Sequence, residues 1–230
     1  MKIITSLFLG ASFIWAAFPV QAQGTFRNLD FESANLPPIQ FGGPVSSLDA
    51  IPGWKAFLGT TQVTQVWQND LTLGNASIDI LGPYYGGRIE GQYTVVLQPG
   101  FDPFVDPFGI SENVSASISQ SALMPANARS LQFKAIIIFG SISVNMGGQD
   151  LFLMPLGTDG HYTLYGADIS LFAGQFETLT ITALAGPNNP FGFDSFVFSP
   201  LAVPEPSTLS LLALGGLLFG LRRRLGLSNG

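Results

Sequence analysis

Few side chains in this sequence could carry out catalysis. The 230 residues include one histidine, His161, and no cysteine, so disulfides, thiolate metal sites and cysteine nucleophiles are excluded. His161 lies in a glycine-rich stretch typical of a surface turn. Gly-x-Ser-x-Gly, His-Glu-x-x-His, phosphate-loop and Gly-x-Gly-x-x-Gly patterns are also absent. We predict a protein that is not an enzyme, with a polysaccharide hydrolase of unrecognised site as one alternative.

Aromatic rings offer a second kind of chemistry, because exposed rings can stack against sugars. The candidates are Trp54, Trp67, Tyr84 and Tyr85. Both tryptophans fall in predicted strands, where large rings more often belong to the core. The two tyrosines lie between Pro83 and a pair of glycines, which predicts a loop. Tyr84 and Tyr85 are therefore the favoured ligand-binding residues.

The charge of the chain argues against one class of partner. Residues 23–203 contain five basic and fourteen acidic side chains, a net charge of −9. Binding to a phosphate backbone requires clustered lysine and arginine. We therefore expect no nucleic-acid partner.

The amino-terminal residues have the pattern of a secretory signal peptide. Lys2 is followed by the apolar stretch 3–18 and by small residues that end at Ala22. This predicts a signal peptide over residues 1–22, cleaved between Ala22 and Gln23. A membrane anchor is the alternative, but it needs about 20 apolar residues and no cleavage site.

The carboxyl-terminal residues combine a proline motif, an apolar stretch and an arginine cluster. A predominantly apolar stretch of fourteen residues, 208–221, would form a helix of roughly 21 Å, which is short for a hydrocarbon core of about 30 Å. The arginines would hold their end of this segment on the cytoplasmic side of the inner membrane. The motif residues are Val203, Pro204, Glu205, Pro206 and Ser207, and the cluster is Arg222, Arg223 and Arg224.

These residues, in this order, resemble the PEP-CTERM sorting class. The resemblance covers residues 204–230 and implies recognition by an exosortase, a membrane-embedded processing enzyme. It further implies a transient inner-membrane intermediate and release to the cell surface or exopolysaccharide matrix of a Gram-negative bacterium. A permanent anchor helix is the alternative.

The segment between the two ends, residues 23–203, has the composition of an all-β domain. It is rich in glycine and proline turns, and apolar residues alternate with polar ones in stretches such as 114–119, 142–146 and 178–183. Further strands are expected at 25–32, 62–67, 76–80, 93–98, 131–139, 162–165 and 193–198, which makes about ten. One helical turn is expected at 168–173, with Asp168 as its cap and Gly174 as its end. We predict a β-sandwich.

The turn, the strand after it, and the stretch Phe193, Asp194, Ser195 and Phe196 resemble galactose-binding-like jelly rolls. The opening Asn28 to Glu32 stretch fits the same class. This resemblance implies a jelly roll and, in many members, a structural Ca²⁺ held by oxygen ligands. The residues it points to are Glu32, Asp49 and Asp194.

Together these observations predict an exported, non-catalytic surface or matrix protein with a structural or adhesive role. A carbohydrate-binding module for exopolysaccharide is the alternative from a different class.

Overall fold

The computed structural model describes residues 24–37, 42–71, 74–104, 112–137, 141–186 and 189–203. Within them the chain forms short strands joined by turns, one α-helix of four residues, α1 (Ser47–Ala50), and one 3₁₀ turn, η1 (Ser170–Phe172). The predicted signal peptide, its cleavage site and the tail from Pro204 onward lie outside the described residues.

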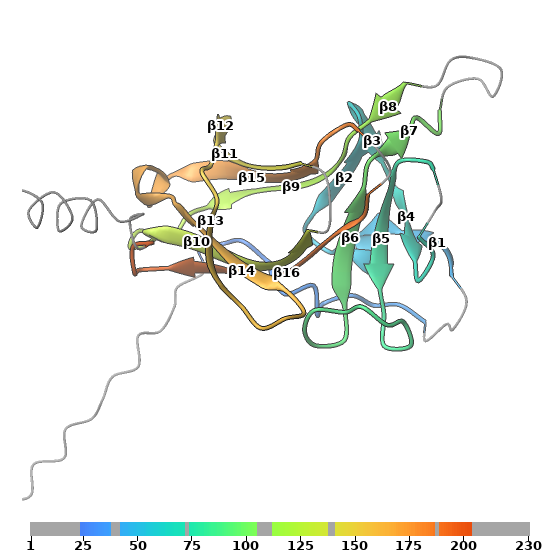
Figure 1. The fold of residues 1–230 in the computed structure, drawn as a ribbon. Helices are drawn as coiled ribbons and strands as arrows, with labels where there is room; N and C mark the ends of the chain where they lie inside the picture. Colours follow the sequence, from blue (N-terminus) through green and yellow to red (C-terminus); the bar gives the residue numbers. More distant parts are fainter. Residues whose placement is uncertain are drawn as a thin grey trace, which may run out of the picture.

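The strands form two large sheets (Figure 1). The first has the order β1 (Gly43–Ser46), β4 (Gln65–Gln68), β5 (Ser77–Leu81), β6 (Thr94–Gln98), β16 (Phe191–Ser199), β10 (Ser130–Ile137), β14 (Thr163–Asp168), β13 (Met154–Thr158). The second has the order β12 (Gln149–Asp150), β11 (Ile142–Met146), β15 (Phe176–Ala183), β9 (Ala116–Leu123), β2 (Lys55–Leu58), β3 (Thr61–Val63). A short ribbon pairs β7 (Gly100–Phe101) with β8 (Asn113–Val114). Neighbouring strands are antiparallel except β4 and β5.

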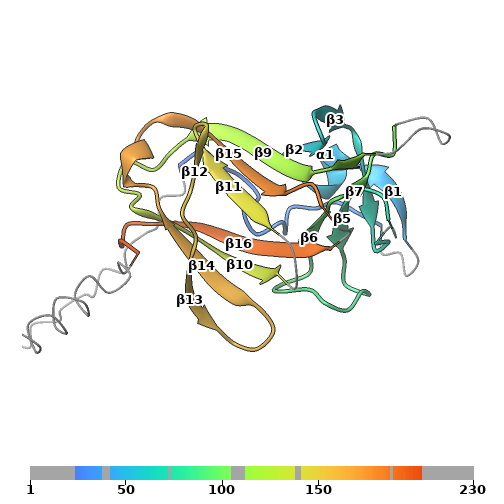
Figure 2. The same cartoon turned by 45° about the horizontal axis from the view of Figure 1, so that its top comes forward.

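The order of the strands is that of a jelly roll. From β9 onward the long strands alternate between the sheets, with β9, β11 and β15 in the second and β10, β14 and β16 in the first. The last strand, β16, lies in the first sheet between β6 and β10. Figure 2 shows β9, β15 and β11 above β16 and β10. Two packed sheets whose antiparallel strands alternate in this way form a double-sheet jelly roll, so the predicted all-β jelly roll is confirmed.

The core between the sheets is built by the predicted period-two pattern. Leu179, Ile181 and Ala183 of β15 are buried, whereas the threonines between them are half-buried on the other face. Trp54 is also a core residue, with its ring 5.8 Å from that of Phe31. Its indole N–H donates to the carbonyl of Asn28 at 3.0 Å. Trp54 is therefore not a surface platform.

The segment 25–32 differs from its prediction, since its side chains Phe26, Leu29 and Phe31 are buried but it is not a strand. Asn28 and Phe31 have φ angles of 51° and 59°, in the left-handed region, which interrupts an extended chain. The carbonyl of Leu29 accepts the N–H of Phe196 at 2.9 Å. The apolar side chains of the segment 25–32 thus enter the core individually and not from one face of a strand.

Two other predictions are refined. The stretch 62–67 is split at Thr64 into β3 and β4, which belong to different sheets. The turn near Asp168 is present in shortened form as η1, but its cap position is Ile169 and not the predicted Asp168. The Asp168 carboxylate still accepts the N–H of Ser170 at 2.8 Å, and Gly174 has the predicted left-handed conformation, with a φ of 73°.

Candidate functional site

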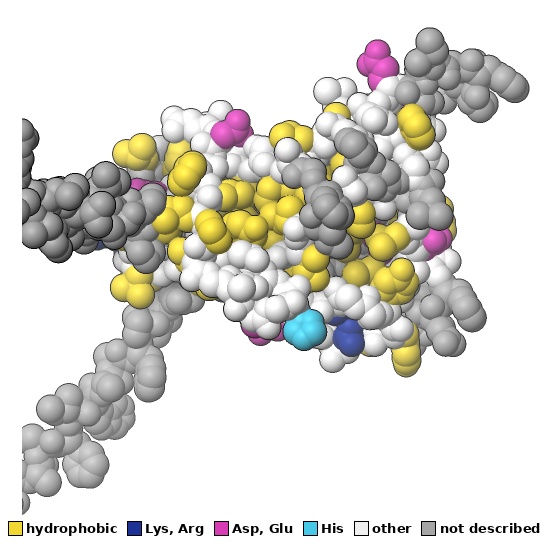
Figure 3. Space-filling view, viewed as in Figure 1, with side chains coloured by type: hydrophobic (Ala, Val, Ile, Leu, Met, Phe, Trp, Pro, Cys, Tyr) yellow, Lys and Arg dark blue, Asp and Glu magenta, His cyan; other side chains and the backbone are white. Residues whose placement is uncertain are grey.

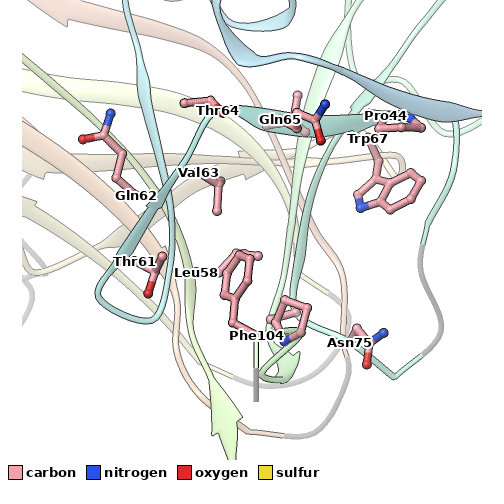
Figure 4. A pocket seen from close by; sticks show the side chains of 13 residues that line it. Pro44, Leu58, Thr61, Gln62, Val63, Thr64, Gln65, Trp67, Asn75 and Phe104 are labelled. Carbon is pink, nitrogen blue, oxygen red and sulfur yellow. The ribbon is translucent and has the colours of Figure 1, made fainter. Parts of the chain in front are cut away.

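A groove of about 380 Å³ lies at the end of the sandwich where the chain passes from β3 to β4 (Figure 4). This volume lies within the range of about 300–1,000 Å³ that is usual for ligand sites. Its walls come from both sheets and from two loops. The lining residues are Pro44, Leu58, Thr61, Gln62, Val63, Thr64, Gln65, Val66, Trp67, Asn75, Ala76, Pro103 and Phe104.

Two aromatic rings face this groove. Trp67 is half-buried on β4 and pairs across the edge of the sheet with Pro44 of β1. Because Val66 points into the core, the alternation of the strand turns Trp67 outward. Phe104 is 58% exposed, and Figure 4 shows its ring and the Trp67 indole on different sides of the groove.

The loop that carries Phe104 is fixed by backbone contacts. The N–H of Phe101 donates to the carbonyl of Gly74 at 2.8 Å, and the carbonyl of Phe101 accepts the N–H of Ala76 at 2.9 Å. The Asp102 carboxylate then accepts the N–H of Phe104 at 2.9 Å. The Phe104 ring is therefore carried by a loop that is hydrogen-bonded to the residues just before β5.

The polar lining of the groove is neutral. None of its lining residues is charged, although residues 23–203 as a whole are strongly acidic. The polar groups are exposed amides and hydroxyls, contributed by Thr61, Gln62, Thr64, Gln65 and Asn75. Such groups can both donate and accept hydrogen bonds, so the groove suits a ligand with many hydroxyl groups and no charge.

The predicted ligand residues Tyr84 and Tyr85 do not line this groove. Tyr84 is 64% exposed, whereas Tyr85 is half-buried and donates its N–H to the carbonyl of Gly82 at 3.0 Å. Both lie in the loop after β5, as predicted. Sequence reasoning considered Trp67 but favoured a core position for it, and it passed over Phe104. The available signal for Phe104 was a phenylalanine after a proline in a long loop.

A second, smaller cavity of about 160 Å³ brings together two of the three predicted calcium ligands. It is lined by Asp30, Glu32, Glu90, Gly91, Asp194 and Ser195. Asp49 is not among these residues and lies exposed in α1. Among the described residues, no three Asp, Glu, His or Cys side chains come together as metal ligands. The predicted trio is therefore not assembled, and melts with and without EGTA test whether any ion binds.

Hydrogen bonds within the protein occupy the carboxylates of this cavity. Glu32 accepts the N–H groups of Gln92 and Tyr93 at 2.8 and 3.0 Å. Asp194 accepts the hydroxyl of Thr94 at 2.6 Å. Burial raises the pKa of Asp194 to about 6, although the hydrogen bond from Thr94 lowers it.

Glu90 completes this cluster with charge-assisted contacts. Its carboxylate forms an ion pair with Lys134 and accepts the hydroxyl of Ser195. The Lys134 contact and then the Ser195 hydrogen bond hold the pKa of Glu90 below its usual value. Gly91 has a φ of 60°, which favours glycine, and a Cβ there would lie 2.3 Å from a Glu32 oxygen and displace that carboxylate. The hydrogen bonds of Glu90 with Asp194 and Ser195 thus hold the loop at 90–93 against β16.

Comparison with known families assigns the last part of the chain. Residues 202–224 match the family model of the PEP-CTERM protein-sorting motif. The chain carries a PEP-CTERM sorting motif. The predicted motif residues from Val203 to Ser207 and the arginines 222–224 fall within the match, so that resemblance is confirmed. The PEP-CTERM motif indicates a secreted protein that is routed through the membrane to the cell surface. Val203 alone of these residues is described, and it is half-buried.

A solved structure that resembles the chain is a family 11 carbohydrate-binding module from Clostridium thermocellum, in complex with a beta-1,3-1,4-mixed-linked tetrasaccharide. It shares 9% sequence identity over 70% of this chain and 98% of that chain, with a TM-score of 0.31. A TM-score this low supports no inference about fold or function. No curated protein matches the chain.

In the described part of the chain, no helix is both long and apolar enough to cross a bilayer. The predicted segment 208–221 is outside that part.

Proposed function

We propose that this chain is an exported matrix protein whose jelly roll binds a neutral polysaccharide in the groove between Trp67 and Phe104. The observation that supports this proposal is the composition of the groove. Two aromatic side chains flank amides and hydroxyls, and no charged residue lines it. The C–H faces of a sugar can pack on aromatic rings while its hydroxyls bond to the amides.

The neutral lining selects the class of polysaccharide. An anionic polymer would approach a domain of net charge −9 and find no lysine or arginine in the groove to compensate its charge. A neutral polymer is not repelled by the net charge and needs no cation in the groove. The groove therefore favours the carbohydrate-binding alternative and gives the proposed adhesive role a mechanism.

Binding can be measured by affinity electrophoresis of the tail-free protein in gels containing neutral or anionic polysaccharides. Trp67→Ala and Phe104→Ala should each weaken binding to the neutral polymer by tenfold or more, about 1.4 kcal/mol. Tyr84→Ala is the matched control for Phe104→Ala, because Tyr84 is 64% exposed, close to the 58% of Phe104, but does not line the groove. Phe104→Ala should leave the fold intact, since the Phe104 ring is 58% exposed, so a loss of binding in this variant would not reflect misfolding.

Three outcomes would contradict the proposal. Loss of binding only in Tyr84→Ala would place the site on the predicted tyrosine loop. Equal retardation by anionic polymers would contradict the neutral ligand. Turnover of the polymer would establish the hydrolase alternative.

We also propose that an exosortase removes the tail after residues 208–221 have entered the inner membrane. The PEP-CTERM match supports this step, as does an apolar segment too short to span comfortably. Two prolines keep the motif out of a helix and extended for a cleft. Mass spectrometry of the surface fraction should find a carboxyl terminus between Pro204 and Ser207, and Glu205→Ala should reduce this product. An intact terminus at Gly230 would show a permanent anchor.

A further inference from the structure

The described chain stops at one end of the sandwich, opposite the groove. The hydroxyl of Ser130 donates to the carbonyl of Leu201 at 2.8 Å, which holds the last residues against the start of β10. At the same end Leu123 finishes β9 and pairs with Phe176, which begins β15. The turn η1 precedes β15 here. We call this the tail end.

Exposed apolar side chains gather at the tail end. They are Leu123, Leu171, Phe176 and Leu201, with exposed fractions of 45%, 77%, 70% and 71%. Figure 3 shows hydrophobic side chains at this left-hand end of the molecule. Several large apolar groups left in water at one place usually mark a surface that is covered in function.

The length of chain beyond Val203 indicates what covers them. Four residues, 204–207, separate Val203 from the apolar segment 208–221. Fully extended, they span at most about 14 Å. Once the segment is in the bilayer, the tail end cannot be far from its surface. So short a tether gives a high effective concentration, and weak apolar contacts then suffice.

We propose that the tail end rests on the outer surface of the inner membrane, with Leu171 and Phe176 inserted among the lipids, until the tail is cut. This inference rests on the proposed membrane insertion of residues 208–221. Charges of both signs lie near the tail end in the chain: Arg129 precedes β10, Asp168 ends β14 and Glu177 follows Phe176 in β15. The contact is therefore apolar and does not require anionic lipid. Docking holds the motif at 204–207 against the membrane surface, where a membrane-embedded enzyme can reach it.

Because the chain has no cysteine, single cysteines can report on this contact. The full chain carrying Phe176→Cys is labelled with an environment-sensitive fluorophore and reconstituted in phosphatidylcholine vesicles. Leu184→Cys is the matched control, since Leu184 is 42% exposed just beyond the other end of β15, roughly 26 Å away. Leu214→Cys reports on the tail itself.

We expect the label at 176 and the label at 214 to show blue-shifted emission and at least threefold protection from iodide quenching, relative to the label at 184. A shielded label at 214 with labels at 176 and 184 equally quenched would overturn the docking while leaving the tail inserted. A quenched label at 214 would overturn insertion and the docking with it. Shielding at 176 only in membranes that contain the processing enzyme would assign the surface to that enzyme and overturn the lipid contact.

Discussion

Asp79 carries a buried carboxylate that is only partly hydrogen-bonded. It is 1% exposed on β5, and one oxygen accepts the N–H of Asp70 at 2.9 Å. The other oxygen has no hydrogen-bond partner in the described structure. Burial raises the pKa of Asp79 to about 6, although hydrogen bonds from the backbone N–H groups of Asp70 and Asn69 lower it; the charge of Asp70 adds a smaller rise. Since the folded pKa exceeds the unfolded value of 3.8, stability is lost as pH rises from about 4 to 6.

Asp79→Asn should therefore stabilise the protein above pH 6. A shift from 3.8 to about 6 corresponds to roughly 3 kcal/mol as an upper bound, and the gain should vanish near pH 4. Urea unfolding of wild type and variant at pH 4, 6 and 8 measures this difference. Asp49→Asn is the control, because Asp49 is exposed. A gain of the same size at every pH would contradict this account.

At the level of residues, the sequence predicted site residues that are contiguous in a motif. It did not predict those whose role depends on which face of a strand is buried. The proline motif and the arginines at 222–224 are contiguous, so their resemblance to the sorting motif was readable and is matched by the family model. Whether Trp54 or Trp67 faces the core depends on which side of its strand is covered. Trp54 is buried among aromatic rings and Trp67 lines the groove, a difference that nothing in their local sequence shows.

Gln120 of β9 joins an irregular segment to a regular strand. Its amide oxygen accepts the N–H of Arg27 at 2.6 Å, and its amide nitrogen donates to the carbonyl of Arg27 at 2.9 Å. The side chain thus takes the place of a neighbouring strand for the segment 25–32. Gln120 is 6% exposed, so water cannot easily replace these bonds.

Gln120→Leu should cost about 2 kcal/mol in the free energy of unfolding, because two backbone groups lose their partners. Hydrogen exchange should accelerate first in residues 26–31, since local opening follows the lost anchors. Denaturant unfolding and exchange mass spectrometry measure the two effects. Gln149→Leu, at an exposed position in β12, is the matched control. Equal losses in both variants would show that the amide contacts contribute nothing.

At the level of elements, alternation predicted most of the strands that lie wholly within one sheet. Strands β9, β11 and β15 follow the period-two pattern because each buries one face along its whole length. The prediction did not reveal the break at Thr64, where the exposed Thr64 and Gln65 separate Val63 from Val66 and the chain changes sheets. It also misassigned residues 25–32, because apolar residues can reach a core from a chain held by side-chain contacts.

In the whole molecule, the groove and the tail end lie at opposite ends of the sandwich. Leu58, which lines the groove, pairs with Ala116 at the start of β9, whereas Leu123 at the far end of β9 belongs to the tail end. In Figure 1 the groove strands β1, β3 and β4 lie on the right and the start of β10 on the left. A strand of eight residues separates the two ends by roughly 26 Å.

This separation predicts that sorting and ligand binding are independent. A jelly roll anchored by its tail would hold the groove away from the lipid surface, so polymer should reach it before processing as well as after. We expect the affinity for neutral polysaccharide to agree within twofold between the full chain in nanodiscs and the tail-free protein, measured by titration calorimetry. The Trp67→Ala variant in both forms supplies the background. A gain of tenfold or more on removal of the tail would mean that the membrane covers the groove, which the opposite placement of the two ends does not allow.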